Sequence, residues 1–268
     1  MSLKYSLYEA SVQTPDVHVS LFKQMFFEAR RRHPLVLRED FCGTFAISRA
    51  WAAQSARHRA IGVDLSAEPL KFGHARLARA LRKRVKTHRE DVCTNRARSE
   101  IAVACNFSFC TFKDEKTLTR YFRNAHRSLT ADGLLVLEIA GGPGMIEKTT
   151  DRRRFRLRNK IGYTYFWEQS FFDPVTHDAR YAIHFQLPNG KKIKNAFTYD
   201  WRLWTIPELR RLLKQAGFDS TCVYWEETDE SGGGSGVYRR TEEGSNDYAW
   251  VAYVVGVKRG KSRPHAQD

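Results

Sequence analysis

The 268-residue sequence predicts an α/β protein: a doubly wound, mainly parallel sheet of seven strands with an inserted antiparallel β-meander that caps it. Two observations predict the sheet: continuous apolar runs recur along the first half of the chain, and segments with helical spacing of apolar residues separate them. This alternation is typical of parallel strands covered by helices on both faces. A third observation predicts the meander, since segment 155–204 is rich in aromatic residues and turn signals but has no helical pattern.

Apolar periodicity places the elements of the first half in a regular order. Residues 1–33 are expected to form a helical arm, which Pro15 interrupts because proline cannot continue a helix. Five buried strands are then predicted at residues 35–37, 60–63, near 85, 101–105 and 134–139. The clearest helix precedes the fifth strand, since Asp114 is a suitable N-cap and Leu118, Tyr121 and Phe122 share one face.

The second half of the chain completes this pattern. Segment 155–204 is expected to form three antiparallel strands, and the capping-box spacing of Thr205 and Glu208 predicts a helix after them. Two last strands are predicted at 218–226 and 248–257, with a flexible glycine-rich stretch, 231–236, between them. The expected domains are the arm (1–33), the core (34–145 and 205–258), the inserted meander (146–204) and a flexible tail (259–268).

Composition restricts the class of protein and its partners. The chain carries 45 Lys and Arg against 30 Asp and Glu, a net charge of +15, which favours RNA or another anionic partner or else a solvated basic surface. No window approaches ~18 consecutive apolar residues, so no membrane-spanning helix is expected. Five cysteines without framework spacing indicate reduced thiols and a cytoplasmic location. The sequence does not predict an oligomeric state.

Three carboxylates stand at the ends of three successive predicted strands: Glu39, Asp64 and Asp91. In an open parallel sheet, ligands bind beyond the carboxyl ends of the strands, so these side chains suit a ligand with an ammonium group, a ribose diol and an exocyclic amine. Asp64 lies 21 residues after Gly43, the spacing at which a carboxylate meets ribose hydroxyls. Asp91 precedes the apolar Val92, which suits the edge and face of an adenine.

With these motifs the chain resembles the class I S-adenosylmethionine-dependent methyltransferases, which have a Rossmann-like fold. The family's first motif stands here as Glu39-Asp40-Phe41-Cys42-Gly43-Thr44-Phe45, with phenylalanines at the first and third glycine positions. Its second motif resembles residues 60–65, and later elements resemble 129–136 and 205–218. The resemblance implies that the chain is an enzyme with S-adenosylmethionine as cofactor. It implies these cofactor-binding residues: Glu39, Phe41, Cys42, Gly43, Thr44, Asp64, Leu65, Asp91, Val92 and Asn106.

Less specific patterns suggest where the methyl acceptor binds. Asn106 follows the fourth predicted strand, where this family faces the reacting methyl group, and it is the candidate catalytic residue; a simple strand-end turn is the alternative. The candidate substrate-binding residues are Tyr5, Tyr8, Phe107, Trp167 and Trp201, for which packing in a core is the alternative. No metal is expected, because the nine histidines show no ligand spacing.

The expected reaction is in-line transfer of a methyl group to a small molecule, because the meander and the arm resemble a lid over a pocket. An RNA methyltransferase is the main alternative, favoured by the net charge of +15. More distant alternatives are a nicotinamide-dependent oxidoreductase, for which the GxGxxG fingerprint is missing, and a non-catalytic binding protein on the same fold.

Overall fold

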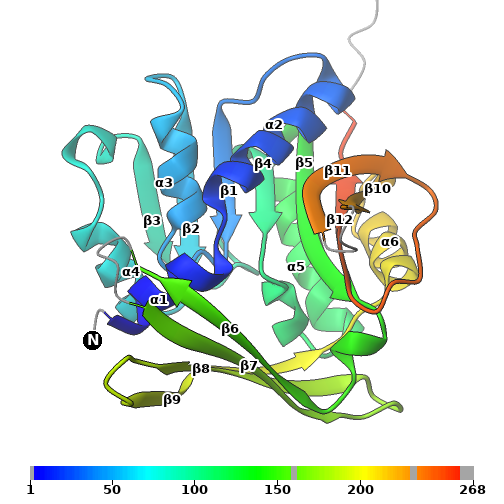
Figure 1. The fold of residues 1–268 in the computed structure, drawn as a ribbon. Coiled ribbons are helices and arrows are strands. Elements are labelled where there is room, and N and C mark those ends of the chain that lie inside the picture. Colours follow the sequence, from blue (N-terminus) through cyan, green and yellow to red (C-terminus); the bar gives the residue numbers. More distant parts are fainter. Residues whose placement is uncertain (1–2, 158–161, 230–233, 260–268) are drawn as a thin grey trace, which may run out of the picture.

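The computed structural model describes residues 3–157, 162–229 and 234–259, and two sheets dominate it (Figure 1). The larger sheet has the order β11-β10-β12-β5-β4-β1-β2-β3, with β1 to β5 parallel and β12, β10 and β11 antiparallel. Its strands are β1 (Val36–Asp40), β2 (Arg59–Asp64), β3 (Val85–Arg89), β4 (Ser99–Ala104), β5 (Leu129–Gly141), β10 (Ser220–Thr228), β11 (Gly234–Thr241) and β12 (Trp250–Val257). The predicted mainly parallel sheet is confirmed.

The large sheet has eight strands instead of seven, because β11 pairs with the outer edge of β10. Part of the glycine-rich stretch predicted to be flexible, Gly234 to Gly236, belongs to this strand, whereas residues 231–233 lie outside the described residues. An open strand edge offers unpaired backbone groups, and the buried Tyr238 gives β11 an apolar anchor on the sheet. Most of the predicted tail, residues 260–268, also lies outside the described residues.

Helices cover both faces of the large sheet, as the alternation of strands and helices predicts. The helices are α1 (Leu3–Val12), α2 (Pro15–Arg30), α3 (Ala46–Ala53), α4 (Ala67–Ala75), α5 (Glu115–Ser128) and α6 (Ile206–Gln215), with short turns η1 (Arg79–Leu81), η2 (Ser108–Thr111) and η3 (Pro143–Met145). Alternate side chains of β5 pack into different cores: Val136 contacts the side of α2 and α3, and Leu137 contacts the side of α5 and α6. Among the described residues, no helix is long and apolar enough to cross a bilayer.

The smaller sheet is the predicted meander, with four antiparallel strands in sequential order. They are β6 (Thr149–Arg156), β7 (Gly162–Phe172), β8 (Asp178–Gln186) and β9 (Lys192–Arg202). Three strands are expected from sequence, and β6 is the additional one: its middle residues, 150–154, are exposed and mostly charged, so they give no apolar signal. The sheet lies across the carboxyl ends of the parallel strands (Figure 1).

The N-terminal arm connects the two sheets. Helix α2 packs on the large sheet through apolar residues that include Phe22 and Phe26, which are fully buried. Helix α1 packs on the small sheet, where Leu7 contacts a core formed with Tyr163 and Phe185. Because Pro15 begins α2, the chain can turn between the two helices, so that α1 packs on the small sheet and α2 on the large sheet.

Replacing Leu7 with alanine should loosen this connection. Leu7 is fully buried, so Leu7→Ala removes packing and leaves a cavity, which we expect to lower the free energy of unfolding by about 2–5 kcal/mol. The matched control is Leu3→Ala in the same helix, which should change it by less than about 0.5 kcal/mol because Leu3 is exposed. Urea unfolding measures both values, and equal effects of the two substitutions would show that α1 is not anchored through Leu7.

Candidate functional site

The strand order of the large sheet changes direction between β1 and β4, which are neighbours although β2 and β3 separate them in sequence. In open α/β sheets such a switch point opens a crevice at the carboxyl ends of the strands. A cavity of about 640 Å³, which we call the loop cavity, lies there between the segment after β1, the segment after β4 and helix α1. Seven of the ten predicted cofactor-binding residues line it: Glu39, Phe41, Cys42, Gly43, Thr44, Asp64 and Asn106.

The segments after β1 and β4, the first and second loop of this cavity, hold their backbone in a conformation that is uncommon for residues with side chains. Phe41, Asn106 and Phe107 all have φ between 52° and 56°, and Gly43 has φ of 52°. Such left-handed residues persist only where the surroundings fix them, and they concentrate at functional sites. Here the amide of Cys42 donates to the Val63 carbonyl at 3.0 Å, which ties the first loop to the end of β2.

Asp64 fixes the first loop from the end of β2. One carboxylate oxygen accepts the Gly43 amide at 2.7 Å and the other accepts the Ser66 amide at 2.7 Å. Each oxygen keeps a lone pair for a further donor. A Cβ atom built on Gly43 would meet nothing within 4 Å, so the space beside this glycine is open to a ligand. Asp64 therefore has both the position and the remaining acceptor capacity to bind two neighbouring hydroxyl groups.

Glu39 stabilises the start of helix α3 and also lines the loop cavity. The same carboxylate oxygen accepts from the amide of Ser48 at 2.7 Å and from its hydroxyl at 2.6 Å. Burial raises the pKa of Glu39 to about 7, although the two hydrogen bonds from Ser48 oppose the shift. The side chain is 3% exposed. With this pKa, both the protonated and the ionised form of the carboxyl group are populated at neutral pH.

The two phenylalanines at the family's glycine positions are accommodated without filling the loop. The Phe41 ring lies 5.6 Å from each of Phe112 and Tyr121, measured between centroids, and so extends the core around α5. Phe45 is fully buried, and its ring occupies the space beside Gly73, where a Cβ atom would come within 2.3 Å of it. The close approach of the backbone to a ligand is therefore left to Gly43.

Three predicted cofactor-binding residues lie outside the loop cavity: Leu65, Asp91 and Val92. Leu65 follows Asp64 and is 67% exposed. Asp91 accepts the Cys93 amide at 2.8 Å and caps its own turn, and Val92 is buried in the core on the side of α5. The buried Cys42 does line the cavity, but burial raises the pKa of its thiol well above the usual value, which makes it a poor nucleophile.

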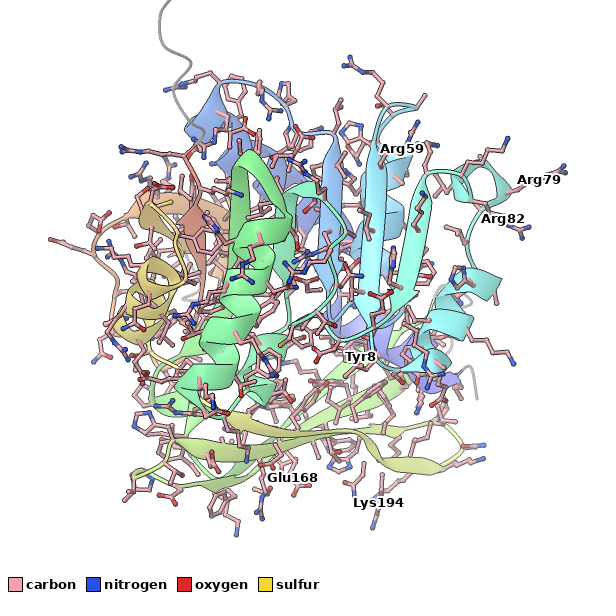
Figure 2. The ribbon with its side chains drawn as sticks, turned by 180° about the vertical axis from the view of Figure 1, so that it is seen from behind. Tyr8, Arg59, Arg79, Arg82, Glu168 and Lys194 are labelled. Carbon is pink, nitrogen blue, oxygen red and sulfur yellow. The ribbon has the colours of Figure 1, made fainter. Side chains whose placement is uncertain are left out.

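A second cavity of about 600 Å³, the meander cavity, lies between the small sheet and the strands β5, β10 and β12. All five predicted substrate-binding residues line at least one cavity as aromatic walls: Tyr8, Phe107, Trp167 and Trp201 line this one, and Tyr5 lines the loop cavity. The two cavities share four residues: Tyr8, Asn106, Tyr199 and Trp201. Figure 2 shows Tyr8 between the two sheets, where the cavities meet.

Glu138, which sequence reasoning missed, holds this junction together. Its carboxylate accepts the amide of Asn106 at 2.6 Å and lies 3.6 Å from Nε2 of His18 on α2. It also lines the meander cavity. Burial opposes its ionisation, but the hydrogen bond and charge of His18 lower the pKa of Glu138 below its usual value. The signal in the sequence is a single carboxylate within the apolar run 134–139.

His18, Cys105 and Glu138 each present one possible metal ligand, and these atoms lie within 4.8 Å of one another, although the sequence predicts no metal. A thiol must lose its proton to bind a metal, but burial and the nearby carboxylates raise the pKa of Cys105 well above the usual value. We therefore interpret the cluster as an ion pair of His18 and Glu138 beside a protonated thiol.

The free energy of unfolding should depend on pH through Glu39. Because this carboxyl group holds its proton more tightly in the folded chain, folding takes up a proton between about pH 4.5 and 7. The stability of the wild type should therefore fall as pH rises through this window, by roughly 3 kcal/mol from this group. Urea unfolding of Glu39→Gln should show a shallower dependence, whereas Glu243→Gln, at an exposed position, should keep the wild-type slope. Identical slopes for all three chains would contradict this assignment.

Known proteins share both the central segment and the fold. Residues 40–137 match the family model of a methyltransferase domain. The structure is similar to an amino pentose methyltransferase from Micromonospora echinaspora involved in calicheamicin biosynthesis, with TM-score 0.68 and 14% identity over 96% of this chain and 97% of that one. It is similar to an S-adenosylmethionine-dependent methyltransferase from Clostridium acetobutylicum, with TM-score 0.67 and 14% identity over 95% and 96%.

A sugar N-methyltransferase from Streptoalloteichus sp. is also similar, with TM-score 0.66 and 17% identity over 94% of this chain and 91% of that one. No curated protein sequence matches the chain. At these identities the structural likeness shows the fold, and the matched domain contains the first loop, Asp64 and Asn106. Residues 40–137 therefore match a methyltransferase domain, and the chain has the fold of these S-adenosylmethionine-dependent methyltransferases.

Proposed function

We propose that the chain transfers a methyl group from S-adenosylmethionine to a small molecule, with the donor in the loop cavity and the acceptor in the meander cavity. The observation that carries the proposal is the shared boundary of the two cavities at the switch point, formed by Tyr8, Asn106, Tyr199 and Trp201. A donor and an acceptor bound on the two sides of this boundary can react in line without leaving the protein.

The loop cavity has the groups that the methyl donor requires. Asp64 would bind the ribose hydroxyls, and the open space beside Gly43 would admit the ligand to the backbone. Gln13 on the N-terminal arm also lines the cavity, and its buried Oε1 atom has no hydrogen-bond partner in the described part of the chain. An unpaired buried acceptor costs free energy, and a donor group on a ligand would remove that cost.

S-adenosylmethionine, when bound, supplies a methyl group on a positively charged sulfur that a lone pair of the acceptor can attack. The chain's part is to orient the acceptor and exclude water. Burial raises the pKa of Tyr8 to about 12, and it raises the pKa of Tyr199 as well, so both hydroxyls keep their protons at neutral pH. The junction therefore contributes position and hydrogen-bond donors, and Asn106, at the boundary of both cavities, is the candidate for direct contact with the reacting groups.

A small-molecule acceptor also agrees with the size of the meander cavity, and the similar structures include enzymes named for sugar substrates. The five cysteines are all free and buried, which supports a reducing compartment, and we propose a cytoplasmic location. Contacts of Asp91, Val92 and Leu65 with an adenine stay predictions: Leu65 is exposed beyond the cavity, whereas Val92 is buried in the core.

Replacing Asp64 with alanine should weaken binding of S-adenosylmethionine and its demethylated product. Losing the hydrogen bonds to the ribose and the anchor of Gly43 should cost roughly 1–3 kcal/mol, so affinity should fall about 5- to 150-fold. Titration calorimetry measures this, with Asp16→Ala, an exposed position in α2, as the matched control. The wild type should not bind NAD. Unchanged affinity in Asp64→Ala would remove this residue from the site.

RNA is the alternative acceptor, favoured by the net charge of +15. Arg59, Arg79 and Arg82 project from the far end of the large sheet, away from Tyr8 (Figure 2), and Arg153 is the only basic residue among the described residues that line the meander cavity. A polyanion bound to the basic surface would therefore not reach the junction through a basic channel.

Salt dependence separates the two acceptor classes. Each phosphate contact to a single strand contributes about −0.7 to the slope of log affinity against log salt, so five contacts would give about −3.5. We expect no such RNA binding, and little change when Arg152, Arg153 and Arg154 are all replaced with alanine. Filter binding to a single-stranded RNA at several salt concentrations tests this. Tight, steeply salt-dependent binding that the triple substitution abolishes would favour the RNA enzyme.

A further inference from the structure

The meander cavity has a charge opposite to that of the whole chain. Its described lining includes five carboxylates but one basic side chain, Arg153, in a protein of net charge +15. The carboxylates come from three strands and one loop: Glu138 on β5, Asp151 on β6, Glu226 and Glu227 on β10, and Asp247 before β12. Because they converge from separate elements on one cavity, their combined field favours a positively charged occupant.

The chain's own cations neutralise only part of this charge. Glu227 pairs with Arg239 of β11, and Asp151 lies 3.9 Å from Arg153. Within the described ranges, Glu226 and Asp247 have no ion-pair partner; Glu226 accepts the amide of Gly236 at 3.0 Å. Within the described ranges, no cation of the chain therefore pairs with these two carboxylates in the wall of the cavity.

Aromatic rings form the rest of the wall. The rings of Trp225 and Trp250 lie 4.7 Å apart between centroids at one side, and those of Trp167 and Trp201 lie 6.3 Å apart at the other. The π face of tryptophan attracts cations more strongly than that of any other side chain. A cavity with both carboxylates and indole rings binds an ammonium group better than a neutral or anionic group of the same shape.

Glu138 extends the preference for a positively charged group to the junction with the loop cavity. It is 8% exposed and, as described above, its carboxylate holds the amide of Asn106. The titratable groups that face it from the neighbouring elements are Tyr8, His18, Cys105, Tyr238 and Tyr253. Of these only His18, on α2, can supply a compensating positive charge, since the hydrogen bond and charge of Glu138 raise its pKa although burial opposes the shift.

We propose that the acceptor is a small amine, positively charged at neutral pH and without phosphate or carboxylate groups, whose nitrogen is bound by Glu138 beside the junction. This inference rests on the proposed function and specifies its substrate class. The bound ammonium group gives one proton to bulk water, and the nitrogen lone pair then forms a bond to the methyl carbon. The carbon–sulfur bond breaks with its electron pair left on sulfur, and the product is the N-methylated ammonium ion.

Three probes of one shape and different charge test the inference: benzylamine, benzyl alcohol and benzoate. Their affinities are measured by titration calorimetry on the full chain saturated with S-adenosylhomocysteine, the demethylated cofactor. We expect benzylamine to bind roughly 10- to 100-fold more tightly than benzyl alcohol, and benzoate to bind more weakly than either. Equal affinities for the three probes, or a preference for benzoate, would overturn the inference.

Substitutions test which carboxylates cause the preference for the cationic probe. Glu138→Gln, which keeps an acceptor for the Asn106 amide, should reduce the affinity for benzylamine to within about threefold of that for benzyl alcohol. Glu226→Gln provides a second variant away from the junction. It should reduce the affinity for benzylamine by several fold and leave the affinity for benzyl alcohol unchanged. The control is Glu168→Gln, since Glu168 pairs with His184 and points outward from the small sheet (Figure 2). If Glu168→Gln lowers benzylamine affinity as much as Glu138→Gln does, the binding is not in the meander cavity.

Cofactor binding separates this inference from the proposed function. If S-adenosylhomocysteine binds and the probes show no preference for the cation, the amine inference fails and the methyltransferase proposal stands. If S-adenosylhomocysteine does not bind to the wild type, the proposed function fails, and the amine inference fails with it.

Discussion

The carboxylate of Glu138 is the interaction on which the geometry of the site depends. It joins β5, the turn after β4 and helix α2, because it accepts the Asn106 amide and pairs with His18. Asn106 and Phe107 both have left-handed backbone angles, and a turn of this kind persists only when its surroundings determine it. A buried carboxylate is costly unless it is paired and hydrogen-bonded, and here the pair with His18 and the hydrogen bond from the Asn106 amide offset that cost together.

The N-terminal arm is part of this arrangement rather than an addition to it. Helix α2 supplies His18 to the Glu138 pair, and helix α1 supplies Tyr8 to the boundary between the two cavities. Both helices are anchored on buried apolar surfaces, α2 on the large sheet and α1 on the small one. A displacement of the small sheet would therefore move Tyr8 and Tyr199 together, which couples the width of the junction to the position of the meander.

The sequence predicts most of the large sheet because its buried strands are continuous apolar runs, and it predicts the loop cavity because Glu39 and Asp64 end two of those strands. It does not reveal β6, whose exposed charged residues resemble a loop, or β11, whose position depends on an open edge that only the folded sheet provides. Glu138 and Tyr199 are missed for a different reason. Each looks like an ordinary member of its strand, and only the packing of two sheets brings them to one junction.

The distribution of charge follows from what each surface must do. The excess of arginine and lysine lies outside, where water screens it and the cost of exposing a cation is small. The carboxylates of the meander cavity lie beside aromatic walls, where each charge acts on an occupant over a short distance. Net charge therefore says little about the ligand of this chain. The sign of the few charges that converge on the cavity determines what it can bind, and here that sign is negative.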